Sequence, residues 1–152
     1  MSFKYHASCL HTHPVVDALL AAMRENSFSA ADISSIEAHV YSAAYERLKD
    51  VEPTSPWTAK FSIPFCLAKA AHSESLGLDA FTDEALSDPL VRALMKKVHV
   101  SVDQDLDRSY PENWISWVEV RTASGVVNVA CPEVPKGDPG NPLTLEELKD
   151  KF

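Results

Sequence analysis

The sequence predicts an α+β fold, a two-layer sandwich in which helices cover one face of a mainly antiparallel sheet. Two observations predict this class: helical apolar repeats alternate with β-like segments along the chain, and a hairpin signal lies at residues 114–131. The 152 residues are enough to bury one core and show no internal linker. We therefore expect a single domain over residues 1–152.

Three helices are predicted in the first two thirds of the chain. The first begins at Thr12-His13-Pro14, since proline in a first turn loses no hydrogen bond, and it ends at Asn26. Its apolar residues repeat with the spacing of one helix face: Val16, Leu19, Leu20 and Met23. A longer helix covers about Ala59 to Ser73, where Pro64 requires either a later start or an irregular first turn. A third opens at Asp88-Pro89 and turns four apolar residues inward: Leu90, Val91, Leu94 and Met95.

The strands are predicted from alternation of apolar and polar residues. Residues 33–43 form one strand and residues 98–102 a second. Residues 114–122 and 126–131 form a hairpin around Ala123-Ser124-Gly125. Short helical turns are expected at residues 44–50 and 81–87, and Thr144 caps a last helix after a proline-rich connection.

Composition and charge exclude several classes of function. The formal net charge is −8, with 22 acidic against 14 basic side chains, so the phosphate-neutralising surface of a nucleic-acid-binding protein is not expected. No stretch reaches the roughly 20 apolar residues that span a bilayer, and the first residues lack the apolar run of a signal peptide. The three cysteines are odd in number and far apart, unlike a disulfide framework, so a cytoplasmic location is expected.

Residues 4–13 carry the densest group of reactive side chains: Lys4, His6, Cys9, His11 and His13. They stand just before a predicted helix N-terminus, where free N–H groups and the helix dipole attract anions. Lys4 and one histidine could hold a carboxylate ligand while a second histidine or Cys9 moves a proton, which requires Lys4 and His13 to be partly exposed. The alternative is structural, with His6 and His11 at the surface, His13 as a helix cap and Cys9 in the core.

A zinc site is the competing interpretation of the same segment. Cys9, His11 and His13 would share one face of an extended chain, and a thiolate with imidazoles suits zinc. Zinc motifs draw a second pair of ligands from a separate element, and nothing downstream supplies one. No metal is therefore predicted.

Lys60 and Ser62 are polar residues inside an apolar run. A buried lysine is costly and usually has a partner or a task. Lys60 therefore either serves a site or extends from the start of the helix to solvent.

Four segments, in order and spread over nearly the whole chain, resemble the MmgE/PrpD family. The first runs from Lys4 to Asp17-Ala18 and is similar to a Lys-x-x-x-x-Cys-x-x-x-His-Pro…Asp-Ala motif. Residues 59–65 are similar to an Ala-(Lys/Gln)-Phe-Ser-(Leu/Ile)-Pro-Tyr motif, and residues 110–125 to a strand pair ending in Thr-x-x-Gly. Residues 136–144 are similar to a lysine-glycine-asparagine-proline turn with its following helix. Any one segment is a weak signal, but the four in order are specific.

The resemblance implies the smaller α+β domain of a two-domain enzyme whose active site lies in a cleft against a large helical domain. The family includes 2-methylcitrate dehydratases, cis-aconitate decarboxylases and iminodisuccinate epimerases, which need no cofactor. We therefore expect the substrate, or lid, domain of a lyase that acts on small polycarboxylates such as 2-methylcitrate. The helical domain would lie outside this chain, the full-length protein would be a homodimer, and the isolated chain would be inactive or nearly so.

The resemblance also implies roles for particular residues. His13, Cys9 and Lys4 would be catalytic, and Lys4, His6, Lys60 and Ser62 would bind substrate. In the decarboxylase branch a histidine stands in place of Cys9, and many members have tyrosine in place of Phe65. These departures disfavour decarboxylation and leave dehydration or epimerisation open. Outside enzymes, the alternative is a stand-alone binding domain that kept the fold and lost the chemistry.

Overall fold

A four-stranded mixed sheet forms one layer of the fold, in the order β2-β1-β3-β4. The computed structural model describes residues 3–49, 52–131 and 134–151. Its strands are β1 (Ile33–Val40), β2 (Val98–Val102), β3 (Trp117–Thr122) and β4 (Gly125–Ala130). β1 pairs parallel with β2 and antiparallel with β3, and β3 pairs antiparallel with β4.

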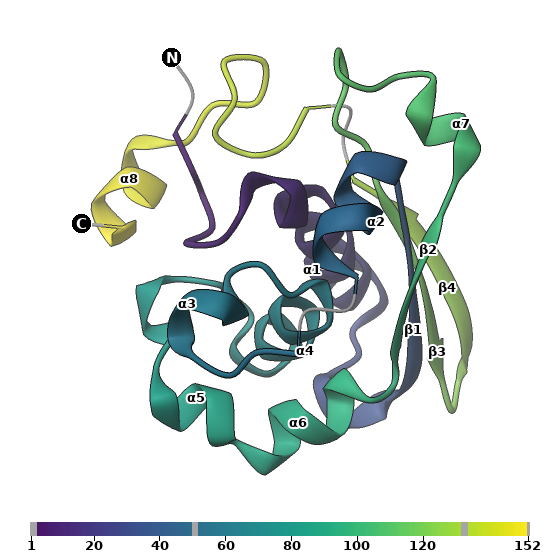
Figure 1. The fold of residues 1–152 in the computed structure, drawn as a ribbon, viewed down its shortest axis with the longest axis vertical. Helices are drawn as coiled ribbons and strands as arrows, with labels where there is room; N and C mark the ends of the chain where they lie inside the picture. The colour runs from purple at the N-terminus through teal and green to yellow at the C-terminus, as the bar shows by residue number, and fades with distance from the viewer. Residues whose placement is uncertain (1–2, 50–51, 132–133, 152) are drawn as a thin grey trace.

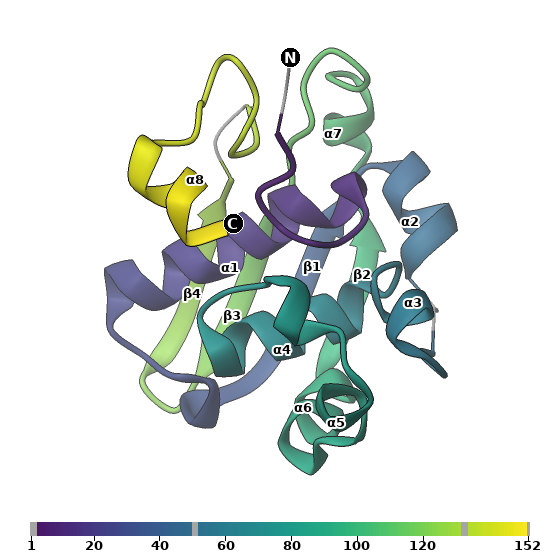
Figure 2. The ribbon, with the colours of Figure 1, turned by 90° about the vertical axis from the view of Figure 1, so that its left-hand side faces the viewer.

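Two helices, α1 (His13–Asn26) and α4 (Ile63–Ser73), cover one face of this sheet. Helix α1 packs on β3 and β4, and α4 packs on α1 and on α6 (Pro89–Met95). Figures 1 and 2 show the sheet on one side of the molecule and these helices on the other. The arrangement confirms the predicted α+β class, with helices against one face of a sheet that has two antiparallel pairings among its three.

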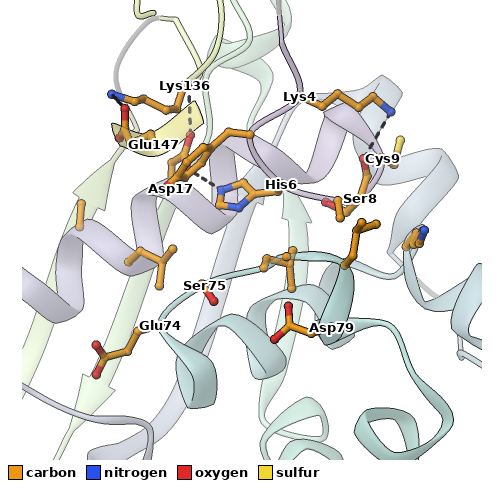
Figure 3. A pocket seen from close by; sticks show the side chains of 18 of the residues that line it. Lys4, His6, Ser8, Cys9, Asp17, Glu74, Ser75, Asp79, Lys136 and Glu147 are labelled. Carbon is orange, nitrogen blue, oxygen red and sulfur yellow. Dashed lines mark hydrogen bonds and ion pairs between the residues drawn. The ribbon is translucent and has the colours of Figure 1, made fainter. Parts of the chain in front are cut away.

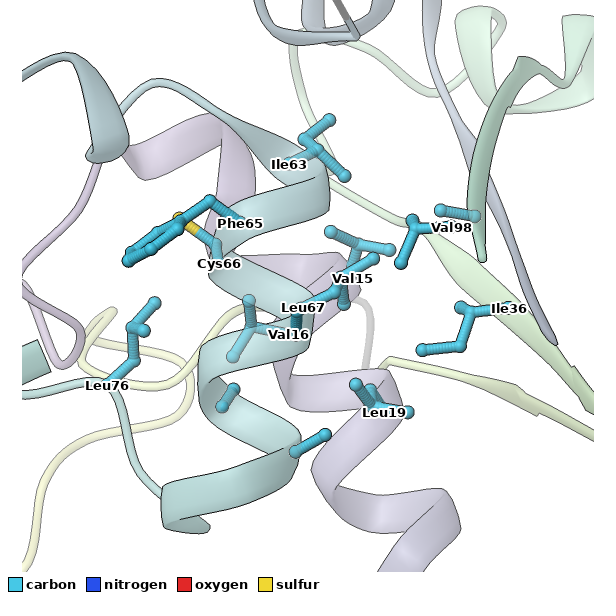
Figure 4. Packing of buried hydrophobic residues seen from close by; sticks show 14 of the residues in the cluster. Val15, Val16, Leu19, Ile36, Ile63, Phe65, Cys66, Leu67, Leu76 and Val98 are labelled. Atoms are coloured by element: carbon cyan, nitrogen blue, oxygen red, sulfur yellow. The ribbon is translucent and has the colours of Figure 1, made fainter. Parts of the chain in front are cut away.

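The hydrophobic core lies between α1, α4 and the inner face of the sheet. Leu19 of α1, Leu67 of α4 and Ile36 of β1 are each fully buried. Figure 4 shows Leu67 and Leu19 on neighbouring helices with Ile36 and Val98 behind them on the sheet. Burial of such side chains contributes about 1.5–3 kcal/mol each, so this layer contact is the main source of stability for the fold.

Shorter helices complete the chain: α2 (Ser42–Leu48), α3 (Pro56–Ala59), α5 (Asp83–Ser87), α7 (Gln104–Asp107) and α8 (Leu145–Lys151). The 3-10 turns η1 (Leu10–Thr12), η2 (Ala30–Asp32) and η3 (Leu78–Ala80) stand between them. Thr144 caps α8 as predicted, since its hydroxyl accepts from the N–H of Glu147 at 3.2 Å. None of the helices in the described ranges combines the length and the apolarity needed to cross a membrane.

The predicted end of the first strand was wrong. β1 stops at Val40 and not at residue 43, because α2 begins at Ser42. The N–H and the hydroxyl of Ser42 donate to the two carboxylate oxygens of Asp107 at 2.7 and 2.6 Å. This long-range partner satisfies a free N–H group at the helix start, which no local pattern could show.

The second long helix begins at Ile63, the later start that Pro64 allowed. Ser62 is its N-cap, and the Ser62 hydroxyl accepts from the N–H of Phe65 at 3.2 Å. The first hairpin strand is shorter than predicted, since β3 begins at Trp117, and the second is displaced by one residue, since β4 is Gly125–Ala130. Trp114 lies outside the strand and stacks on the ring of His11, with ring centres 4.6 Å apart.

The predicted inward position of Leu90 was also wrong. Val91, Leu94 and Met95 of α6 are buried as expected, but Leu90 is 63% exposed. Asp88 caps the helix by accepting from the N–H of Leu90 at 2.8 Å, which makes Leu90 a first-turn residue. Leu90 therefore lies on the side of α6 that faces solvent.

We predict that Leu19→Ala lowers the free energy of unfolding by about 2–5 kcal/mol, since it leaves a cavity between α1 and its neighbours. Leu90→Ala is the matched control, and its effect should stay within about 0.5 kcal/mol because it removes exposed surface. Urea unfolding followed by circular dichroism measures both. Equal losses for the two variants would contradict the layer packing described above.

Candidate functional site

A pocket of about 1270 Å³ lies where the N-terminal segment meets α1, the loops at both ends of α4, and the C-terminal segment. We call it the N-terminal pocket. Its lining comes from residues 4–9, 17–25, 57–61, 74–79 and 136–147. Figure 3 shows residues 4–9 along one side, with the loop that follows α4 opposite them.

Backbone hydrogen bonds hold the N-terminal segment across the end of the helical layer. The N–H of Ala7 donates to the carbonyl of Leu76, and the N–H of Cys9 donates to the carbonyl of Lys60, each at 2.9 Å. Lys60 precedes α4 and Leu76 follows it. The segment therefore connects both ends of one helix, and its side chains are fixed relative to the pocket.

A glycine secures the start of the same segment. The N–H of Phe3 donates to the carbonyl of Gly137 at 2.8 Å. Gly137 has φ +95°, and a Cβ there would lie 2.0 Å from the carbonyl oxygen of Phe3. Only glycine fits this close approach and this backbone conformation. The C-terminal segment is thereby joined to the N-terminal one.

Four of the six predicted site residues line the N-terminal pocket: Lys4, His6, Cys9 and Lys60. Lys4 is exposed, and its ammonium makes one long contact, 3.4 Å to the carbonyl of Ser8. Lys60 is half-buried, with its ammonium 5.5 Å from the centre of the Phe81 ring. Two lysines far apart in the sequence therefore line one pocket. Their roles in binding or catalysis stay predictions.

His6 is almost completely buried, with 2% of its surface exposed. Its Nε2 lies 2.8 Å from Oδ1 of Asp17, a residue of α1. The ring also contacts those of Tyr5 and His13, with centres 4.9 and 5.0 Å apart. The alternative prediction that His6 lies at the surface is therefore wrong.

Sequence reasoning did not assign a role to Asp17, Lys136 or Glu147, although all three line the pocket. Oδ2 of Asp17 lies 3.4 Å from the N–H of Lys136, and the Lys136 ammonium lies 3.1 Å from Glu147 of α8. Asp17 and Lys136 stood in two of the quoted motifs, but the contact between them spans 119 positions. No local pattern predicts it.

His13 is fully buried, so the expectation that it is partly exposed was wrong. It is the first residue of α1, and neither ring nitrogen has a hydrogen-bond partner among the described residues. Burial, with repulsion from His6 as the second cause, lowers the pKa of His13 to about 3. The Ser8 backbone lies close enough to oppose this shift, but not in hydrogen-bonding geometry. A catalytic role for His13 stays a prediction.

Ser62 is also fully buried, and its hydroxyl is engaged in capping α4. Ser62 is not among the residues that line the pocket, and its hydroxyl orients the start of the helix. A substrate-binding role for Ser62 stays a prediction as well.

The residues of the zinc alternative point in different directions. Nδ1 of His11 lies 2.7 Å from the hydroxyl of Tyr41, while His13 packs against His6. Burial lowers the pKa of His11 and raises that of Tyr41. Within the described ranges, no three histidine, cysteine or acidic side chains converge as metal ligands. Of the three residues of the zinc alternative, Cys9 alone lines the N-terminal pocket.

Comparison with protein families shows which family this chain belongs to. A family model described as the MmgE/PrpD C-terminal domain matches residues 6–152. The chain belongs to the MmgE/PrpD family. No curated protein matches the chain in sequence.

The family's motif segments converge on one place in this MmgE/PrpD domain. Residues 4–18, 59–65 and 136–144 lie far apart in the sequence, yet each contributes to the N-terminal pocket. The fourth segment, residues 110–125, supplies β3 and the turn of the hairpin. Three motifs thus build the site, and the fourth builds the sheet behind it.

We predict that His13 makes this MmgE/PrpD domain sensitive to acid. Its pKa of about 3 in the folded chain lies below its ordinary value of 6.5. Above pH 6.5 the ring is neutral in both states and has no effect. As the pH falls toward 3, the unfolded chain binds a proton that the folded chain excludes, so stability falls by up to about 1.4 kcal/mol per pH unit.

Thermal unfolding of His13→Leu between pH 7 and pH 4 measures this contribution, and the pH dependence of stability should become shallower than in the wild type. His72→Leu, at an exposed position near the end of α4, is the matched control and should keep the wild-type dependence. A His13→Leu profile parallel to the wild-type one would show that the buried ring is not responsible.

Proposed function

We propose that this chain is the substrate-binding, or lid, domain of a cofactor-free lyase that dehydrates small polycarboxylates such as 2-methylcitrate. The observation that carries the proposal is that Lys4 and Lys60 line one pocket together with Cys9 and His6. Ammonium groups bind carboxylates through charge-assisted hydrogen bonds. The chain has a net charge of −8, so the attraction of an anion would come from these two lysines and not from the overall charge of the protein.

The chemistry of dehydration suits this set of side chains. Removal of a proton next to a carboxylate places negative charge on that carboxylate, and a fixed ammonium stabilises the charge as it develops. A thiol or an imidazole within reach carries the proton. Lys4 and Lys60 would provide the first function, and Cys9 or His6 the second.

The size of the pocket supports the proposal that another domain supplies a second wall. A volume of about 1270 Å³ exceeds the roughly 300–1,000 Å³ of a typical small-molecule site. We propose that the helical domain of a full-length, homodimeric, cytoplasmic protein closes over this opening and completes the catalytic set. The isolated chain would then bind polycarboxylates weakly and turn over little or no substrate.

Epimerisation of a dicarboxylate is the second candidate, because Cys9 and His6 at the pocket could also supply the two proton carriers that it needs. Epimerisation needs proton removal and return without loss of a hydroxyl group. Two proton carriers of different chemistry in one pocket are compatible with either reaction. Formation of an alkene product by the full-length protein separates dehydration from epimerisation.

We predict that the chain binds citrate and that Lys4→Ala weakens this binding about tenfold or more, since a hydrogen bond to a charged group contributes about 1.5–3 kcal/mol. Isothermal titration calorimetry measures the affinity. Lys96→Ala, which removes an exposed lysine at the end of α6, is the matched control and should bind as the wild type does. Thermal stability should be the same in all three proteins. Equal citrate affinity in the wild type and Lys4→Ala would contradict the proposed site.

A further inference from the structure

We infer that His6 and Asp17 form an oriented proton-transfer pair in the N-terminal pocket, in which Asp17 holds the hydrogen on Nε2 and leaves Nδ1 to exchange a proton with a bound polycarboxylate. The inference rests on the proposed function for its substrate class. Asp17 is a positioning residue in this scheme, and His6 is the group that reacts.

The hydrogen bond determines which nitrogen of His6 carries the hydrogen. Nε2 lies 2.8 Å from Oδ1 of Asp17. A carboxylate only accepts hydrogen bonds, so Nε2 must donate. A neutral imidazole has one N–H group, and Nδ1 is therefore the nitrogen with a lone pair. The described residues offer Nδ1 no hydrogen-bond partner.

Asp17 is itself held in place. Its Oδ2 lies 3.4 Å from the N–H of Lys136, and the Lys136 side chain is paired with Glu147 at 3.1 Å. The C-terminal segment therefore holds the side of the carboxylate that does not face His6. Figure 3 shows Asp17 between His6 and Lys136. Both oxygens have a partner, which fixes the direction from which Oδ1 approaches the imidazole.

The ring of His6 is confined as well. It lines the pocket although only 2% of its surface is exposed. Contacts with the rings of Tyr5 and His13 restrict its rotation. His13 stays neutral at physiological pH because burial lowers its pKa to about 3, so it adds no charge beside His6. A buried, oriented base with a neutral neighbour is suited to repeated proton transfer.

The proton and electron balance is simple. A C–H bond next to a substrate carboxylate breaks, its proton goes to Nδ1 of His6, and its electron pair stays on the substrate, delocalised into the carboxylate. His6 becomes an imidazolium that is paired with Asp17. In dehydration the electron pair forms the new C=C bond and expels the neighbouring hydroxyl group, which takes up a proton from solvent and leaves as water, while the imidazolium of His6 returns its proton to solvent. In epimerisation the Cys9 thiol gives its proton to the carbon from the opposite face, and the imidazolium of His6 then passes its proton through solvent to the Cys9 thiolate.

Nitrogen-15 NMR of the histidine side chains tests the pair directly in this chain. At pH 8 the wild type should show His6 with hydrogen on Nε2, and this hydrogen should exchange slowly with solvent. In Asp17→Asn the amide oxygen should turn to the Lys136 N–H and the amide NH₂ to Nε2, which moves the ring hydrogen to Nδ1. Asp79→Asn makes the same change at another acid of the pocket and should leave His6 unchanged.

Several outcomes decide the matter. Hydrogen on Nδ1 in the wild type, or no change of tautomer in Asp17→Asn, would overturn the pair. If Asp17→Asn does not fold, Asp17→Ala replaces it, and the slowly exchanging Nε2 hydrogen should disappear; its persistence would also overturn the pair. Citrate added to the wild type should shift the Nδ1 resonance of His6 but not the nitrogens of His72. If the tautomers are as predicted but citrate shifts no resonance of His6, the orientation of His6 by Asp17 would be supported. The binding of polycarboxylates would be contradicted.

Discussion

The arrangement of this domain depends on the backbone hydrogen bonds that attach its N-terminal segment to the two ends of α4. Ala7 and Cys9 donate to the carbonyls of Leu76 and Lys60, and Phe3 donates to Gly137. A segment outside helices and strands has no regular backbone hydrogen bonds of its own, so it keeps one conformation only when other elements supply the partners. These contacts place Lys4, His6 and Cys9 along one wall of the pocket. The position of that wall is therefore fixed by the fold.

Burial then separates the histidines of that segment into different chemical environments. His6 has a carboxylate partner and lines the pocket, whereas His13 has none and lies in the core. A buried imidazole without a partner stays neutral because its charged form loses hydration and gains nothing in exchange. His11 is tied to Tyr41 on the other side of the segment. Of the three histidines in this sequence cluster, His6 therefore lines the pocket, and the other two lie outside its lining.

The sequence predicted the fold class and most elements because those signals are local. The helix repeat of α1, the hairpin turn and the cap of α8 need only neighbouring residues. The motif segments placed Lys4, Cys9 and Lys60 together, which periodicity alone could not do. The burial of His13 and the His6–Asp17 pair could not be predicted, because they depend on how residues 3–9 lie against α1 and residues 136–137. The exposure of Leu90 likewise depends on what packs against the first turn of α6, which the helix repeat does not show.

Amide hydrogen exchange measures the central constraint most directly. If the N-terminal segment is fixed by the fold, the N–H groups of Ala7 and Cys9 should exchange nearly as slowly as that of Ala38 in the centre of the sheet, without any ligand or partner domain. The N–H of Ser124 in the hairpin turn provides the fast reference. Exchange of Ala7 and Cys9 as fast as Ser124 would show that the segment is not held in place, and that the pocket does not exist before another domain or a substrate binds.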